Sequence, residues 1–191
     1  MDKVLFNFQP TLRNELIIAE PLCATDFNDL YAAASDPLVW EQHPNQNRYQ
    51  LDEFTNYFTG AMESGGALLV KDAATEETLG CSRYSDHDAA SAVVSVGYTF
   101  FKRSHWGKGH NYALKTAMLE HVFPTMIAAH FYIGACNKRS QVSLERFGAT
   151  KIGEQNMAYY GEVSQLNFVY SIASSQWEEL REKHVASYQL K

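Results

Sequence analysis

The chain of 191 residues has the length of a single domain. With 46% hydrophobic, 13% aromatic and 20% charged residues, its composition excludes a disordered or fibrous protein. Lys and Arg number 16 against 22 Asp and Glu, a formal net charge of −6, which argues against broad electrostatic attraction to nucleic acid or anionic lipid.

The first part of the chain predicts one strand and two helices. Residues 15–22 alternate and are rich in Leu and Ile, which indicates a strand, and a helix is expected to follow to about Ser35. Residues 36–50 hold Pro, Asn and Gln without a sustained period, so we expect a loop there. Apolar residues at spacings of three and four in residues 51–62 predict an amphipathic helix that ends near Gly65.

The middle of the chain predicts three strands and a helix. Residues 67–72, 79–85 and 92–101 are β-like runs separated by turn-rich or polar segments, and an antiparallel meander is their simplest arrangement. Residues 102–109 are expected to form a loop. The apolar stripe in residues 113–122 predicts a helix.

The last part predicts a strand, a short helix, two more strands and a C-terminal helix, at residues 130–136, 137–147, 149–160, 164–172 and 175–189. Ser175 and Glu178 have the spacing of a capping box for the final helix. The order of elements is mixed α/β, for which a ligand site at the C-terminal ends of strands is the first expectation.

The strongest functional signal lies in residues 98–122, where a strand runs into a glycine-bearing loop that opens a helix. Unpaired N–H groups and the helix dipole make such a helix start favourable for phosphate, and Gly107 and Gly109 would let the backbone approach it closely. Local positive charge comes from Lys102, Arg103 and Lys108. Tyr112 stands where a dinucleotide fingerprint needs its third glycine, and no Walker loop is present. For an isolated G-K-G, an ordinary solvated turn is an equally good interpretation.

The chain resembles the GNAT superfamily of acetyl-CoA-dependent N-acetyltransferases, and within it the RimJ/RimL-type ribosomal-protein N-terminal acetyltransferases, over roughly residues 16–170. The superfamily's pyrophosphate motif, [QR]-x-x-G-x-[GA], corresponds to Trp106, Gly107, Lys108, Gly109, His110 and Asn111. Trp106 replaces the usual Gln or Arg, as it often does in the Rim-like group. Asn111 replaces a small residue.

A second landmark of the resemblance is the pattern N-x-x-S with a glycine eleven positions after the Asn, which Asn137, Ser140 and Gly148 match. Many relatives carry a Tyr seven positions after that Asn to protonate the leaving thiolate, whereas this chain has Leu144. The resemblance therefore leaves Ser140 or solvent as the proton donor. Taken alone, Asn137 and Ser140 are most simply a helix N-cap and a first-turn residue.

The resemblance implies the GNAT fold, a mostly antiparallel sheet of about seven strands with helices on both faces. It implies one domain over residues 1–191, with a core of about 15–173. It also implies acetyl-CoA as cosubstrate and direct attack by a primary amine of a protein N-terminus or a small molecule. The coenzyme would contact Thr99, Phe101, Trp106, Gly107, Lys108, Gly109, His110, Asn111, Asn137 and Ser140.

Within this set, the resemblance makes a backbone N–H around Thr99 the oxyanion donor and places Phe101 next along the pantetheine arm. Asn137 and Ser140 are catalytic candidates as well as coenzyme contacts. The alternative is a non-catalytic acyl-CoA-binding sensor or interaction module on the same fold, which Leu144 and Asn111 favour.

The resemblance also makes the loop of residues 40–44 the candidate wall of the acceptor channel. Glu41 could attract an ammonium group, and His43, with an unperturbed pKa near 6.5, could accept its proton. The competing interpretation is a surface loop in which Trp40 is a buried anchor and the polar pair is solvated.

Metal binding and disulfides are not expected. His105, His110 and His121 do not share one helical face, and the cysteines lie far apart without a C-x-x-C pair, at Cys23, Cys81 and Cys136. A reduced, cytoplasmic setting fits them best. We expect neither a signal peptide at residues 1–8 nor a membrane span, no direct nucleic-acid binding, and a homodimer as a candidate assembly.

Overall fold

The computed structural model describes residues 6–189, with side chains to residue 183. Its strands are β1 (Leu12–Arg13), β2 (Ile17–Pro21), β3 (Ala67–Asp72), β4 (Thr78–Asp88), β5 (Val93–Phe101), β6 (Ala128–Gly134), β7 (Thr150–Met157) and β8 (Gln165–Ala173). Its α-helices are α1 (Phe27–Ala34), α2 (Leu51–Glu63), α3 (His110–Val122), α4 (Lys138–Phe147) and α5 (Ser174–Gln189). The expectation for residues 1–8 falls mostly outside the described range.

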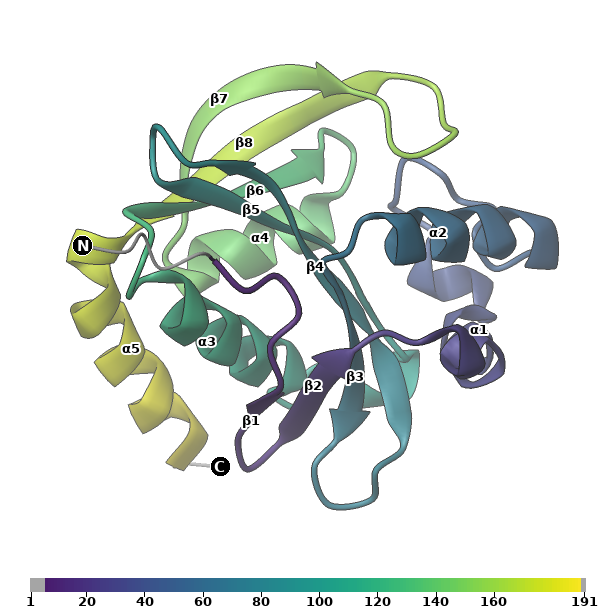
Figure 1. Cartoon of the computed structure of the whole chain (residues 1–191), viewed down its shortest axis with the longest axis horizontal. Coiled ribbons are helices and arrows are strands. Elements are labelled where there is room, and N and C mark those ends of the chain that lie inside the picture. Colours follow the sequence, from purple (N-terminus) through teal and green to yellow (C-terminus); the bar gives the residue numbers. More distant parts are fainter. Residues whose placement is uncertain (1–5, 190–191) are drawn as a thin grey trace.

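The strands of this range form one sheet in the order β1-β2-β3-β4-β5-β6-β8-β7 (Figure 1). Every neighbouring pair is antiparallel except β5 and β6, which run parallel. The predicted mixed α/β fold and the meander of β3, β4 and β5 are confirmed. The prediction of about seven strands missed β1, whose two residues are too short to show any periodicity.

Helices cover both faces of the sheet. Side chains of α3, α4 and α5 pack on one face in a core with Leu68 and Val70 of β3, while α1 and α2 pack on the other face with Ala67 and Leu69. Because successive side chains of a strand point to opposite faces, a strand covered on both sides must be apolar throughout. This explains the unbroken apolar run at the start of β3.

The parallel pair β5 and β6 separates soon after it begins. Only Val93, Val94 and Ser95 of β5 pair with β6, at its first three residues. Beyond this point β5 stays paired with β4, and β6 with β8, so the two strands diverge. The sheet therefore has an opening near its centre, where β5 and β6 are no longer paired.

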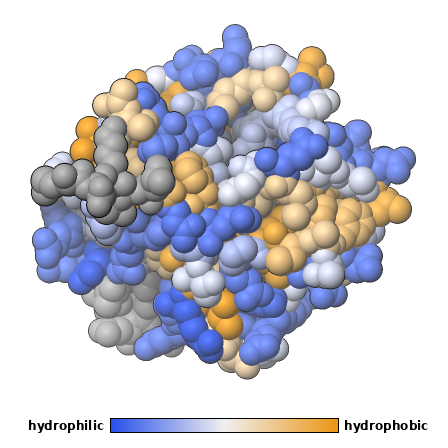
Figure 2. Space-filling model, in the orientation of Figure 1, coloured by the Kyte–Doolittle hydropathy of each residue, from blue (hydrophilic) through white to orange (hydrophobic). Residues whose placement is uncertain are grey.

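The surface facing the viewer in Figure 2 is mainly hydrophilic, with smaller hydrophobic areas between charged regions. No helix within residues 6–189 has both the length and the apolar character required to cross a membrane.

Candidate active site

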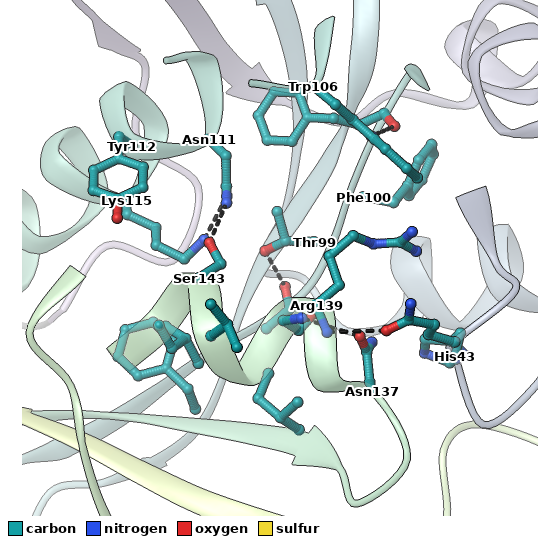
Figure 3. Close-up of a pocket in the computed structure, with 18 of the residues that line it drawn as sticks. His43, Thr99, Phe100, Trp106, Asn111, Tyr112, Lys115, Asn137, Arg139 and Ser143 are labelled. Atoms are coloured by element: carbon teal, nitrogen blue, oxygen red, sulfur yellow. Dashed lines mark hydrogen bonds between the residues drawn. The ribbon is translucent and has the colours of Figure 1, made fainter. Parts of the chain in front are cut away.

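A cleft of about 1290 Å³ occupies the opening between β5 and β6. It is larger than the roughly 300–1,000 Å³ of a typical small-molecule site, so it can take an elongated ligand. Its walls are residues 96–101 of β5, residues 131–134 of β6, the loop and first turns of α3, the first turns of α4, and parts of the segment 39–48 (Figure 3). The cleft thus lies at the C-terminal ends of two parallel strands, where a ligand was expected.

The loop before α3 has the geometry of an anion site. Gly107 and Gly109 adopt positive φ angles of 72° and 91°, and Gly109 is the N-cap of α3 with no side chain to bind the first-turn N–H groups. A Cβ added at Gly107 would meet nothing within 4 Å, so the space beside it is open. Gly107, Lys108 and Gly109 line the cleft, as do Trp106 and Asn111 of the same predicted motif.

Two basic residues near this loop are already paired. Lys102 Nζ lies 2.5 Å from Glu77 Oε1, and Arg103 Nε lies 2.6 Å from Asp36 Oδ2. Neither cation lines the cleft. The positive charge that the sequence attributed to them is therefore directed away from the cleft.

The side chain of His110 also points away from the cleft. Its Nε2 lies 3.0 Å from Asp72 Oδ2 at the end of β3, and this hydrogen bond lowers the pKa of Asp72 to about 2. His105 lies beside this pair, and one possible metal-ligand atom of each of the three residues lies within 4.8 Å of the others. His121 lies elsewhere and hydrogen-bonds to the carbonyl of Asn7. The fold thus brings two of the three histidines together, with an aspartate that sequence reasoning had not included. The expectation of no metal stays a prediction.

Trp106 and Arg139, which both line the cleft, are in direct contact. The indole Nε1 donates to the carbonyl of Phe101 at 2.8 Å, and the Arg139 guanidinium lies 4.2 Å from the centre of the Trp106 ring. Arg139 also pairs with Glu41 at 2.8 Å. Glu41 is about half exposed and does not line the cleft, so its carboxylate holds Arg139 instead of facing a bound amine.

A β-bulge shapes β5 in the middle of the cleft. The register between β4 and β5 shifts between Cys81 and Arg83, where Tyr98 has a φ of 52°. The Tyr57 hydroxyl donates to the Tyr98 carbonyl at 2.9 Å, which holds the bulge in place. Thr99 follows directly and lines the cleft, where the resemblance expected an oxyanion donor.

The start of α4 forms the opposite wall. Asn137 is the N-cap of this helix, and its Oδ1 accepts from the Ser140 N–H at 3.1 Å, as the capping interpretation expected. The Ser140 hydroxyl makes no hydrogen bond to the described residues and lines the cleft. Leu144, one turn further, is 2% exposed and belongs to the core beneath.

The far end of the cleft is enclosed by residues 40–48. Trp40 is buried and donates from Nε1 to the carbonyl of Ala34 at 2.8 Å, so it is the anchor that one interpretation expected. Pro44 packs on Gly134 at the end of β6, where a Cβ would come within 2.6 Å of its ring. These contacts fix the loop against the end of α1 and the end of β6.

His43 lies at this end in a network that sequence reasoning missed. Arg48 Nη1 lies 3.2 Å from His43 Nε2, and His43 Nδ1 contacts the backbone of Asn45. Burial, with a smaller contribution from the Arg48 charge, lowers the pKa of His43 well below its usual value, so the imidazole is neutral near pH 7. Both ring nitrogens are engaged, and Glu41 lies elsewhere, so the fold does not bring the two predicted acceptor residues together.

Arg48 is 2% exposed and binds Glu162 with Nη2 at 2.6 Å. Its guanidinium also lies over the rings of Trp40, Tyr57 and Tyr159. Neither Arg48 nor Tyr159 was predicted, because nothing in the local sequence joins a loop before α2 to one before β8. A buried basic residue with a distant partner has no sequence signature.

Lys115 is another cleft residue that was not predicted. It lies in the second turn of α3, is 8% exposed, and lines the cleft beside Asn111. The spacing of four residues from Asn111 places both side chains on one side of the helix, which is the signal that could have found it.

Residues 16–150 match the acetyltransferase (GNAT) domain family. No curated protein matches the chain. Among solved structures, a GCN5-related N-acetyltransferase from Brucella melitensis is similar with a TM-score of 0.78 and 19% identity, over 93% of this chain and 85% of that one. RimJ from Mycobacterium smegmatis, in complex with CoA-disulfide, is similar with a TM-score of 0.70 and 14% identity, over 94% and 93%.

Proposed function

Because the chain belongs to the acetyltransferase (GNAT) domain family, we propose that it transfers the acetyl group of acetyl-CoA to a primary amine by direct attack. The observation that carries this proposal is the continuity of the cleft. It runs from the left-handed glycines at the start of α3, past the bulge at Tyr98, to the enclosed end at His43. One cleft could therefore hold a phosphate-bearing arm and an acceptor end to end.

The cleft residues fit acetyl-CoA. The uncapped start of α3 and the open space beside Gly107 suit the diphosphate. The gap between β5 and β6 suits an extended arm that can pair with unpaired strand edges. When bound, acetyl-CoA supplies a thioester carbonyl as the acyl donor.

The residues around the bulge and the start of α4 would serve the reaction. Backbone N–H at Thr99 would stabilise the negative charge that develops on the carbonyl oxygen as the amine nitrogen forms its bond to carbon. The carbon–sulfur bond breaks, and the Ser140 hydroxyl would give a proton to the departing sulfur. An ammonium acceptor would lose two protons: one before attack, to water or through the network at His43, and one after attack, which would return to Ser140 and restore its hydroxyl.

The hydrogen bonds around His43 favour an acceptor amine whose pKa is low enough for it to lose a proton without a strong general base. An α-amine with a pKa near 8 is about 10% neutral at pH 7, whereas a lysine-type amine near 10.4 is only about 0.04% neutral. Both ring nitrogens of His43 are engaged, Nε2 by Arg48 and Nδ1 by the backbone of Asn45, so the one lone pair of the neutral ring already has a protein partner. A protein N-terminal α-amine is therefore the first candidate acceptor, in line with the W-G-K-G motif of the Rim-like group, and a small-molecule amine is the second.

A panel of amines tests the proposal. Short peptides with free N-termini, the same peptides with blocked N-termini and an internal lysine, and a polyamine are incubated with acetyl-CoA, and acetylated products are identified by mass spectrometry. We expect product with free N-termini and much less with the lysine peptides. Coenzyme binding without any product would instead support the acyl-CoA-binding module, which the leucine at position 144 favours.

A further inference from the structure

The first turns of α3 carry a buried lysine that faces the cleft. Lys115 Nζ donates to Asn111 Oδ1, and Asn111 Nδ2 donates to the Ser143 hydroxyl of α4 at 3.2 Å (Figure 3). The Asn111 amide is thus held between the two helices and accepts from the ammonium group. This chain of contacts fixes the Lys115 side chain, 92% buried, along the cleft wall.

No negative group in the described part of the chain balances this charge. Among residues 6–183, no carboxylate lies within ion-pair distance of Lys115. A buried ammonium with only a neutral amide partner is unfavourable, and burial accordingly lowers the pKa of Lys115 to about 7. A bound anion beside Lys115 would stabilise its ammonium form.

The position of the ammonium group indicates which anion. Side chains on a helix lean toward its N-terminus, and contact with Asn111 places Lys115 Nζ at the level of the first turn. This is the end of α3 that follows Gly107 and Gly109 and whose dipole is positive. An anion held by the loop would therefore lie near the ammonium group.

We propose that Lys115 is an anion-binding residue of this cleft, whose ammonium group pairs with an oxygen of the coenzyme's diphosphate. The inference rests on the proposed function only in taking a coenzyme A compound as the ligand. It does not require turnover, since an acyl-CoA-binding module would use the same contact. It adds a buried cation to the charge of Lys108 in the glycine loop, while Lys102 and Arg103 are paired elsewhere.

The contact between Lys115 and the diphosphate would couple coenzyme binding to the uptake of a proton by Lys115. Near pH 8 the free protein holds Lys115 largely neutral, whereas the complex needs the ammonium form, so binding takes up a proton and weakens as the pH rises. Other titratable or charged groups occur on the elements around the lysine: His105, Lys108, His110, Tyr112, Tyr98, Tyr132, Glu145 and Arg146. They are unchanged in a Lys115 variant, so the difference between variant and wild type isolates the lysine.

Calorimetric titration with CoA and with dephospho-CoA, which lacks the 3′-phosphate, tests the proposal at pH 7.0 and 8.5. We expect Lys115→Met to weaken binding of both ligands by roughly 10- to 100-fold at pH 7.0, the value of a charge-assisted hydrogen bond. Wild-type affinity should fall about tenfold from pH 7.0 to 8.5, and that of Lys115→Met should not. Lys151→Met, on β7 and paired with Glu154, is the matched control and should bind as wild type.

Lys115→Arg provides a second variant that keeps the charge. Because arginine stays protonated at both pH values, this variant should bind CoA but lose the pH dependence. Wild-type affinity in a folded Lys115→Met protein would overturn the proposal. So would a loss confined to CoA, because that places the contact at the 3′-phosphate. Turnover plays no part in this test, so an inactive protein that binds CoA as described would refute the proposed function alone.

Discussion

The residues around the cleft are of two kinds. Some have polar groups whose hydrogen bonds and ion pairs are made within the protein, and others have polar groups or open space available to a ligand. His43, Arg48 and Arg139 belong to the first kind, since each is held by two or more protein groups. The Ser140 hydroxyl and the open side of Gly107 belong to the second. The second kind lies where we propose that the diphosphate and the thioester bind, which is where binding and chemistry would need it.

Gly107→Asp should weaken CoA binding strongly. The substitution places a carboxylate in the open space where phosphate would lie, and repulsion between desolvated like charges should reduce affinity by at least about tenfold. Gly65→Asp is the matched control, because Gly65 also has a positive φ, of 61°, and open space around it but lies in the turn after α2. Both variants should lose similar thermal stability, and calorimetry should find a loss of CoA affinity only at position 107.

Ser140→Ala should lower turnover without lowering coenzyme affinity. Loss of a general acid reduces the rate of the chemical step by roughly 10²- to 10⁴-fold, whereas the backbone N–H that Asn137 caps is unchanged. Single-turnover measurements of CoA release, with CoA affinity measured in parallel, check this result. Full single-turnover activity in the variant would mean that the thiolate leaves without Ser140.

The glycines, Trp106, Asn137 and Ser140 could be predicted because each belongs to a local motif. Lys115 and Arg48 were not predicted, because their roles depend on burial and on contacts between distant segments. The charges of Lys102 and Arg103 were assigned to the anion loop, but partners on other segments, Glu77 and Asp36, direct them elsewhere. Pairing of charges is set by the fold and cannot be read from neighbours in sequence.

Helix α4 depends on its N-cap, and this allows two roles of Asn137 to be separated. Asn137→Ala removes the acceptor for the Ser140 N–H and should cost about 1 kcal/mol of unfolding free energy, which lowers Tm by roughly 2–4 °C. Asn137→Ser keeps a capping oxygen and should restore most of the stability. If CoA affinity is lost in both variants to the same extent, Asn137 also contacts the coenzyme; recovery with serine would limit its role to the cap.

The start of α3 is anchored to the end of β3 by His110 and Asp72. The folded-state pKa of Asp72, about 2, is below its unfolded value near 3.9, so the carboxylate stabilises the fold above about pH 4 and this contribution is lost as pH falls toward 2. Asp72→Asn should therefore be less stable than wild type in urea unfolding at pH 6, with the difference shrinking near pH 3. A constant difference across this range would assign the effect to packing.

Periodic elements were predicted well, and irregular ones were not. The helix α2 and the strand β3 were placed within one residue, because long amphipathic or apolar runs have a clear period. The helix α3 ends at residue 122 as predicted but begins at His110, three residues before the predicted stripe. The bulge at Tyr98 could not be predicted from pattern, because it arises from the pairing of β5 with β4. The resemblance to the GNAT superfamily pointed to Thr99 as the oxyanion donor, and the structure places this residue immediately after the bulge.

At the scale of the whole molecule, binding should be visible as stabilisation. CoA at 100 times its Kd should add about 2.7 kcal/mol to the unfolding free energy, which raises Tm by roughly 5–10 °C for a chain of this size. A thermal melt with and without CoA measures the shift. Because the net charge is −6 and the ligand is an anion, moderate salt should change the shift less than it would for a basic protein, since long-range attraction contributes little.

The short parallel pairing between β5 and β6 separates the strands of the sheet into two groups that follow each other in sequence. Every strand on one side comes from residues 12–101 and every strand on the other from residues 128–173, so the sheet consists of two consecutive halves of the chain joined at three paired residues. A ligand in the cleft would act as a removable substitute for the missing strand pairs and join the halves into one cooperative unit. Hydrogen exchange should then slow in β5 and β6 together when CoA binds, although they belong to different halves.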